Sequence, residues 1–195
     1  MAAPSAPGPA LGLLELASVA RGVVVADAAL KRAPAVLLSS RTLSGGKHLI
    51  VLEGDVASVE EAMAAGRAAA AALLVDRVEL AMADAQVWPM LAAGGVIAPG
   101  DWAGDDAAEA VAIVETQTVC AAIAAADAAC KAAEVTVRDV RLAIDLAGKA
   151  VFTFTGALAA VEAAAAAAAA AAEHRLVQLE QIAQPAPELR GRLFR

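Results

Sequence analysis

The sequence predicts an α+β protein made of two tandem ferredoxin-like units, each with the element order β-α-β-β-α-β. Three observations predict this fold. The block VADAALKRA at residues 25–33 returns as AADAACKAA at residues 125–133. Charged residues and glycines of the two halves align in the same order. Each half also runs through the same series of short apolar runs, Gly-containing loops and helical patterns, which indicates duplication of one folding unit.

The two copies align residue by residue with one small insertion. Residues 10–41 match residues 110–141 at an offset of 100, and from Gly46 onward the offset is 102. The second copy therefore carries two extra residues between Arg141 and Gly148. The matched polar pairs include Glu15 with Glu115, Asp27 with Asp127, Lys31 with Lys131, Arg41 with Arg141, and Lys47 with Lys149.

The first unit opens with the apolar run ALGLLEL at residues 10–16, which predicts a short strand. Ser18 follows as an N-cap, because its hydroxyl can accept from a free N–H of the first helical turn. Pro34 ends the helix that Ser18 begins. Helical spacing predicts a buried face made of Val19, Val23, Ala26, Leu30 and Ala33.

A hairpin and a second helix complete the first unit. Two extended runs, 36–43 and 47–54, are separated by Ser-Gly-Gly, which is typical of a hairpin. Asp55 can cap a helix from about residue 56 to 72, with Val56, Val59 and Met63 on one face. The run LLVDRVEL at 73–80 predicts the last strand.

The second unit repeats this order. Its first strand is AVAIVET at 110–116, Thr118 is the matching N-cap, the alanine run 163–172 lies within the second helix, and RLVQLEQIA at 175–183 is the last strand. We predict domains at 10–91 and 110–195, joined by a linker at 92–109 that is rich in Gly, Asp and Ala.

Composition narrows the classes of function and partner. The net charge of −7 argues against nucleic acid, which needs a basic surface. Cys120 and Cys130 form no CxxC pair, so we expect buried thiols in a reducing cytosol. The alanine run is too short for a membrane span, so no membrane partner is expected. The first ten residues lack the features of a secretory signal and are expected to be a disordered tail.

No combination of residues suits catalysis or a cofactor. His48 and His174 are the only histidines, and neither has a Cys or carboxylate at metal-ligand spacing. His48 lies beside the Gly loop, where it is either an ordinary strand residue or a contact for anions. Glu15 and Glu115 occupy equivalent strand ends, so equivalent structural roles are expected. We predict no catalytic residue, no metal site and no cofactor.

The remaining distinctive feature is the pair of hairpin loops. The first contains Ser44, Gly45, Gly46 and Lys47, and the second contains Ile144, Asp145 and Leu146 before Gly148 and Lys149. SGGK lacks the spacing of a phosphate-binding P-loop. From the residues alone, these loops are interpreted as plain hairpin turns.

The order of these motifs resembles a bacterial microcompartment (BMC) shell domain. ALGLLEL, VADAALKRA, SGGK and GDVASVEEAMAAG carry the resemblance in the first unit. AVAIVET, AADAACKAA, AGKA and TGALAAVEAA carry it in the second. Two such domains in one chain resemble the tandem-domain shell proteins, and the resemblance covers nearly the whole chain.

The resemblance implies a structural role with no enzyme activity. It implies a homotrimer in which six domains form a pseudohexagonal tile, packed beside other shell proteins in a cytoplasmic microcompartment. The hairpin loops would line a central pore for metabolites. The implied pore-lining residues are Ser44, Gly45, Gly46, Lys47, Ile144, Asp145 and Leu146. Lys31 and Lys131 would be the tile-edge contacts.

One position departs from the family pattern. The family often has an Arg after the last strand that supports the edge contact, whereas this chain has Met82 and Gln184 there. The alternative function is a ligand-binding regulatory protein built from the same tandem units, because the ferredoxin-like architecture hosts many functions. The repeated lysine favours the tile, since a regulator needs no lattice edge.

Overall fold

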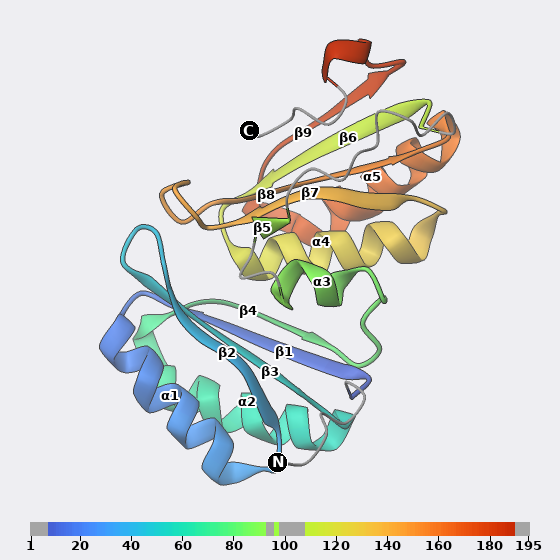
Figure 1. The fold of residues 1–195 in the computed structure, drawn as a ribbon. Helices are drawn as coiled ribbons and strands as arrows, with labels where there is room; N and C mark the ends of the chain where they lie inside the picture. Colours follow the sequence, from blue (N-terminus) through green and yellow to red (C-terminus); the bar gives the residue numbers. More distant parts are fainter. Residues whose placement is uncertain (1–7, 93–95, 98–107, 190–195) are drawn as a thin grey trace. The chain divides into compact units, whose positions relative to one another are not determined.

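The computed structural model describes residues 8–92, 96–97 and 108–189. The chain divides into two compact units, unit 1 within residues 1–83 and unit 2 within residues 84–195 (Figure 1). Residues 1–7 of the expected N-terminal tail and most of the expected linker at 92–109 lie outside the described residues, whereas Ala10, the last residue of that tail, is buried in the first strand.

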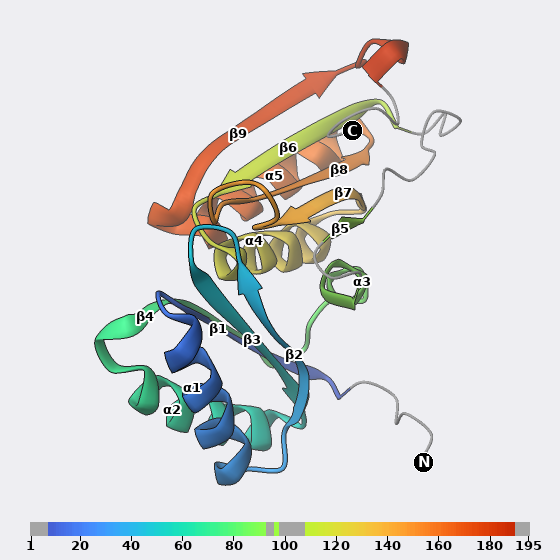
Figure 2. The ribbon, with the colours of Figure 1, turned by 60° about the vertical axis from the view of Figure 1, so that its left-hand side comes forward.

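Unit 1 has the predicted element order. Its elements are β1 (Ala10–Leu16), α1 (Val19–Arg32), β2 (Val36–Leu43), β3 (Lys47–Gly54), α2 (Val56–Ala70), a 3₁₀ turn at Ala71–Leu73 and β4 (Leu74–Leu80). The strands form one antiparallel sheet in the order β2-β3-β1-β4. Both helices cover the same face of this sheet (Figure 2).

Unit 2 repeats the fold and adds two short elements before it. Its elements are α3 (Val87–Ala92), β5 (Val96–Ile97), β6 (Ala110–Thr116), α4 (Val119–Ala132), β7 (Thr136–Leu142), β8 (Ala150–Gly156), α5 (Leu158–Ala172), a 3₁₀ turn at Glu173–Arg175, β9 (Leu176–Ala183) and a 3₁₀ turn at Pro187–Leu189. The sheet order is β5-β7-β8-β6-β9, so β5 pairs with the β7 edge.

Local chemistry explains where the helices begin. Ser18 accepts from the Arg21 N–H at 3.3 Å, and Thr118 accepts from the Ala121 N–H at 3.2 Å. Asp55 accepts from the Ser58 N–H at 2.9 Å. These three predicted N-caps are confirmed. The helix α5 begins at Leu158, and its N-cap residue Ala157 has no side-chain acceptor, but the Glu109 carboxylate accepts from the Leu158 N–H at 3.2 Å.

The core of unit 1 lies between the sheet and the two helices. It consists of the buried residues Ala10, Leu14, Leu16, Val25, Ala26, Ala29, Ile50, Leu52, Val59, Ala62, Met63 and Ala70. In unit 2, Phe152 and Phe154 occupy the strand positions that match Ile50 and Leu52, and both rings are fully buried. Larger strand side chains in unit 2 therefore accompany helices that are richer in alanine.

The predicted buried face of α1 is right for Ala26, which is buried, and for Ala33, which packs half-buried against the core, but it is wrong for the other three residues. Val19, Val23 and Leu30 are exposed, and the buried residues of α1 are Gly22, Val25, Ala26 and Ala29. Gly22 explains the difference, because a Cβ built there would lie 2.2 Å from the ring of His48. The helix therefore approaches β3 through its smallest residue and leaves aliphatic side chains on its outer surface.

Both cysteines are free thiols; Cys120 is buried as expected, whereas Cys130 is half-buried. Burial raises the pKa of the Cys130 thiol to about 12, and Asp84 and Asp127 raise it further. A thiol of this kind is a poor nucleophile. Among the described residues, no helix combines the length and apolar character that crossing a bilayer requires.

Candidate functional site

The first candidate pore loop is a short hairpin connection between β2 and β3. Leu43 pairs with Lys47, so only Ser44, Gly45 and Gly46 lie between the strands. Gly45 and Gly46 have φ values of 79° and 75°, a backbone region that favours glycine. A Cβ at Gly46 would meet no atom within 4 Å, so conformation rather than crowding requires glycine there.

The second loop spans residues 143–149 and is built differently. Leu142 pairs with Ala150, and the backbone between them takes positive φ at Ala143 (58°), Asp145 (57°) and Ala147 (51°). Gly148 follows with a φ of 88°. Left-handed conformations at alanine are unfavourable relative to glycine, so this loop holds a more strained backbone than the first loop.

An ion pair fixes the base of the first loop. Lys47 Nζ lies 2.6 Å from Glu15 Oε1, and the Glu15 side chain is 0% exposed. Arg41 lies near the same carboxylate. Burial lowers the pKa of the Arg41 guanidinium, and the negative charge of Glu15 partly offsets that shift. Two cations therefore balance one buried carboxylate where the hairpin leaves the sheet.

Unit 2 contains the matching pair in a more exposed place. Lys149 Nζ lies 2.8 Å from Glu115 Oε1, and the Glu115 side chain is 36% exposed. The Glu–Lys pair therefore occurs in both units, although its desolvation differs. The equivalent structural roles predicted for Glu15 and Glu115 are confirmed. The Lys47 pairing was missed, although matched Glu and Lys positions in both repeats were a signal for it.

Each candidate edge lysine is also paired. Lys31 Nζ lies 2.6 Å from Asp27 Oδ2, and Lys131 Nζ lies 2.6 Å from Asp127 Oδ2. The Asp27 side chain is 58% exposed, but that of Asp127 is 7% exposed. Both lysines lie on outer helix surfaces, as the helical spacing predicts.

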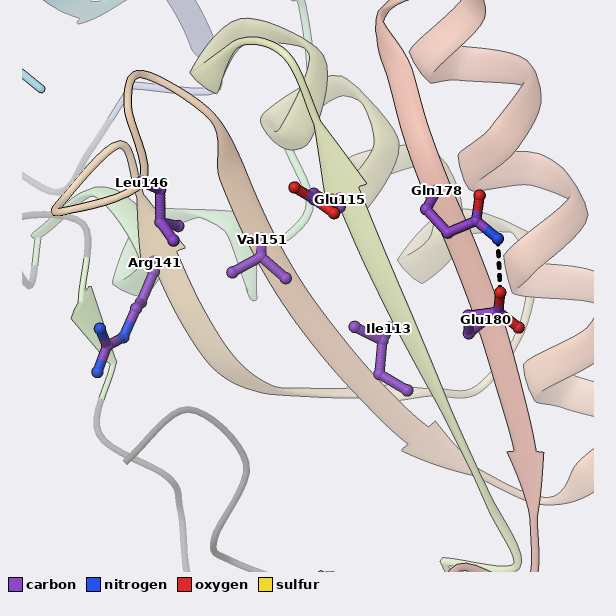
Figure 3. Close-up of a pocket in the computed structure, with 7 residues that line it drawn as sticks. All are labelled: Ile113, Glu115, Arg141, Leu146, Val151, Gln178 and Glu180. Carbon is purple, nitrogen blue, oxygen red and sulfur yellow. Dashed lines mark hydrogen bonds between the residues drawn. The ribbon is translucent and has the colours of Figure 1, made fainter. Parts of the chain in front are cut away.

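A pocket of about 410 Å³ lies beside the second loop in unit 2 (Figure 3). By the repeat, Ile113, Glu115 and Val151 lie on the sheet face that α4 and α5 do not cover, since the matched unit 1 positions alternate with those that face α1 and α2. The lining residues are Ile113, Glu115, Arg141, Leu146, Val151, Gln178 and Glu180. The pocket therefore combines aliphatic walls with three charged side chains.

His48 is a buried structural residue. Its Nε2 lies 2.8 Å from Ser40 Oγ, and its Nδ1 is buried without a hydrogen bond among the described residues. Burial lowers the pKa of the imidazole. His174 is exposed beside Glu173. Within the described part of the chain, no group of three His, Cys, Asp or Glu residues could hold a metal ion.

Comparison with known proteins identifies the class. The BMC domain family model matches residues 10–83 and again residues 110–185. The chain therefore belongs to the BMC domain family, with two domains in tandem.

Individual relatives agree with this assignment. The chain is 40% identical over 152 residues to the bacterial microcompartment shell protein PduT of Citrobacter freundii, covering 78% of each chain. It is 48% identical over 61 residues to the shell protein EutK of Salmonella typhimurium, covering 31% of this chain and 37% of EutK. A crystal structure of a microcompartment protein from Desulfitobacterium hafniense DCB superposes with a TM-score of 0.75 at 33% identity, covering 92% of this chain and 97% of that one.

These relationships define the role of the chain as structural. It is a shell protein of a bacterial microcompartment and has no enzyme function. The resemblance noted in the sequence is confirmed at the level of family, fold and shell role.

Proposed function

We propose that three copies of this chain form a pseudohexagonal tile of the shell, with a central pore lined by the hairpin loops and with the two lysines at its edges. The duplicated fold carries this proposal, because two units per chain fill six similar positions with three chains. A head-to-tail contact between unlike units generates a closed ring when the rotation between neighbours closes.

Exposed apolar surface on α1 supports a trimer. Val19, Val23, Val24 and Leu30 are all more than a third exposed on this one helix. At 3.6 residues per turn, Val19, Val23 and Leu30 share one face of the helix and Val24 lies on another, and an exposed apolar face of this kind indicates a protein interface. Unit 2 offers a complementary surface on its open sheet face, where Ile113, Leu146 and Val151 line a pocket. A ring in which α1 of one chain meets this face of the next would bury both.

The two hairpin loops support the pore. Small residues at Ser44, Gly45 and Gly46 leave room for an opening on a symmetry axis. Ile144, Asp145 and Leu146 alternate with them around the ring and add three carboxylates. Rings of identical groups set charge selectivity in other pores. In this proposal Lys47 lines the pore at the base of its loop, where Glu15 balances its charge.

The edge lysines support packing between tiles and with other shell proteins. Lys31 is 74% exposed on its helix, and its exposed partner Asp27 is easily exchanged for another acceptor. Lys131 is also partly exposed, although it forms an ion pair with the buried Asp127. The tile would then meet its neighbours through both kinds of unit.

Light scattering and electron microscopy of the purified protein test this proposal. We expect the mass of a trimer in solution, and sheets or shells at high concentration. A monomer or hexamer mass would contradict the trimer. Discrete trimers that never form sheets, alone or with other shell proteins, would contradict the proposed contacts at the tile edges.

The edge assignment has its own test. We expect Lys31→Ala combined with Lys131→Ala to weaken sheet formation while the trimer stays folded, because both lysines lie at the surface. Thermal unfolding is measured beside the microscopy, since Lys131→Ala also removes the partner of a buried carboxylate. Unchanged sheets would contradict the edge assignment.

A further inference from the structure

The segment that begins unit 2 binds to α4 and β7. The Asp84 N–H donates to Asp127 Oδ1 at 2.8 Å. The Gln86 side chain donates to the Val135 carbonyl at 2.9 Å and accepts from the Val137 N–H at 2.9 Å. Residues 84–91, here called the leading segment, include most of α3, which packs against α4 in both ribbon views (Figures 1 and 2).

Unit 1 contains the matching surface without a matching segment. The helix α1 and strand β2 correspond to α4 and β7, and Asp27 corresponds to Asp127. Asp27 Oδ2 binds Lys31 just as Asp127 Oδ2 binds Lys131. Asp127 Oδ1 also accepts from the leading segment, whereas Asp27 Oδ1 has no such donor among the described residues. This accounts for part of the difference in exposure between the two aspartates.

The chain contains the matching segment after β9. Residues 186–189, here called the trailing segment, come after β9 and lie at the repeat offset of 102 from residues 84–87, although β9 ends one residue later than the offset requires and Gln184 has a positive φ of 49°. Both make the same turn: Val87 N–H donates to the Asp84 carbonyl at 3.0 Å, and Leu189 N–H donates to the Ala186 carbonyl at 2.9 Å. Val87 is 0% exposed and Leu189 is 40% exposed. The trailing segment therefore shares the first turn of the leading segment, but its apolar residue at the end of that turn is exposed.

We propose that the trailing segment of one chain docks on α1 and β2 of a second copy, where Ala186 N–H donates to Asp27 Oδ1 and Leu189 takes the place that Val87 has in unit 2. This inference rests on the proposed trimer and names a contact that joins its chains. In the part of the chain that the structure describes, each chain has a trailing segment that contacts no matching surface and an α1/β2 surface that no matching segment covers. In a closed ring, the trailing segment of each chain can therefore cover the α1/β2 surface of the next.

One substitution limits the match. Glu188 stands where the leading segment has Gln86. A carboxylate keeps the acceptor for the N–H of Leu37, which corresponds to Val137, but it has no donor for the Ala35 carbonyl. We therefore assign one hydrogen bond to this position in place of two, and the Asp27 and Leu189 contacts carry the docking.

Paired cysteines test the contact. Asp27→Cys with Ala186→Cys is made in a background in which Cys120 and Cys130 are replaced by alanine. Asp84→Cys with Asp127→Cys is the matched control, because the structure already brings these positions together within unit 2. After mild oxidation, non-reducing electrophoresis should show dimers and trimers for the first pair. The control should remain a monomer with an internal disulfide.

The other outcomes are distinct. If the control closes and the mass is that of a trimer, but the first pair never links chains, the docking is wrong and the trimer stands. A monomer mass overturns both proposals. A disulfide of the first pair within one chain overturns the second copy as the occupant.

A substitution pair provides an independent readout. Leu189→Ser should raise the dissociation constant of the trimer by about tenfold or more, because a buried leucine contributes enough for a tenfold change. Leu158→Ser is the control, since Leu158 is equally exposed, at 40%, but lies in α5 outside the proposed contact. Equal dissociation constants for the two variants would overturn the docking.

Discussion

The two units carry the same two ion pairs with opposite degrees of burial. In unit 1 the loop pair Glu15–Lys47 is buried and the helix pair Asp27–Lys31 is exposed. In unit 2 the helix pair has the buried carboxylate, and the loop pair is open to solvent. Both units thus keep the geometry of each ion pair. The burial of the pair in each unit decides how much that pair contributes to stability.

The largest expected effect follows from removing one partner of the buried loop pair. Lys47→Ala leaves the Glu15 carboxylate desolvated with Arg41 as its remaining cation, so we expect a loss of about 3 kcal/mol in the free energy of unfolding. Lys149→Ala should cost about 1 kcal/mol or less, because its partner is exposed. Urea unfolding of both variants measures the difference. Equal losses would show that burial does not separate the two pairs.

The contact between the first helix and the sheet also differs between units. Gly22 packs on His48 in unit 1, whereas the matched positions in unit 2 are Ala122 and Ala150. Gly22→Ala should destabilise the protein by about 2 kcal/mol through overpacking, although alanine is the better helix former. His48→Ala in the same chain should recover part of the loss. Additive effects in this double-mutant cycle would contradict the contact.

A pH dependence follows from the same histidine. Burial lowers the native pKa of His48 below its ordinary value of 6.5. The unfolded chain therefore binds a proton at a higher pH than the native protein does. Stability contributed by neutral His48 is present above about pH 6.5 and is lost as the pH falls toward the native pKa.

Unfolding experiments at pH 8 and pH 5.5 measure this effect. We expect His48→Gln to reduce the loss of stability on acidification, because glutamine does not titrate. His174→Gln is the control, since His174 is exposed. If both variants lose as much stability as the parent protein, His48 does not set the dependence.

The smallest effect on stability is expected at the tips of the two hairpin loops. There the two units are compared by which loop tip lies nearer the trimer axis. Ser44→Cys and Asp145→Cys should leave the free energy of unfolding unchanged within about 0.5 kcal/mol. The tip that lies nearer the trimer axis should link chains under mild oxidation and bind a soft metal ion such as Zn²⁺ at one ion per trimer. If Ser44→Cys never links chains while Asp145→Cys does, the longer loop occupies the axis.

Element boundaries were predictable because local chemistry sets them. Ser18, Asp55 and Thr118 fix helix starts, and the glycines of the first loop fix its hairpin. Because the sequence repeats, each element boundary predicted in one half could be compared with the matching boundary in the other half. These signals act over a few residues, so a single sequence contains them.

Side-chain surroundings were less predictable, because they depend on residues distant in sequence. Valines and alanines occur on all sides of α1 itself, so helical spacing did not show that Gly22 is the residue that faces His48. The contact of Asp127 with Asp84 joins positions 43 residues apart and has no local signal. The Glu15–Lys47 pair could have been inferred from the hairpin register together with its repeat in unit 2.

The alanine-rich contact between α4 and α5 has a consequence for sequence drift. The residues buried in α5 are Val161, Ala164, Ala165, Ala168 and Ala172, and those buried in α4 are Ala121, Ala122, Ala125, Ala126 and Ala129 together with Val119, Cys120, Ile123 and Asp127. Most of these side chains are single methyl groups, so almost every substitution enlarges a side chain in a filled space. Glycine, the remaining smaller choice, weakens the helix itself. We therefore expect these positions to tolerate little change in either direction, so that tolerated substitutions in unit 2 fall mainly in its loops and on its outer helix surfaces.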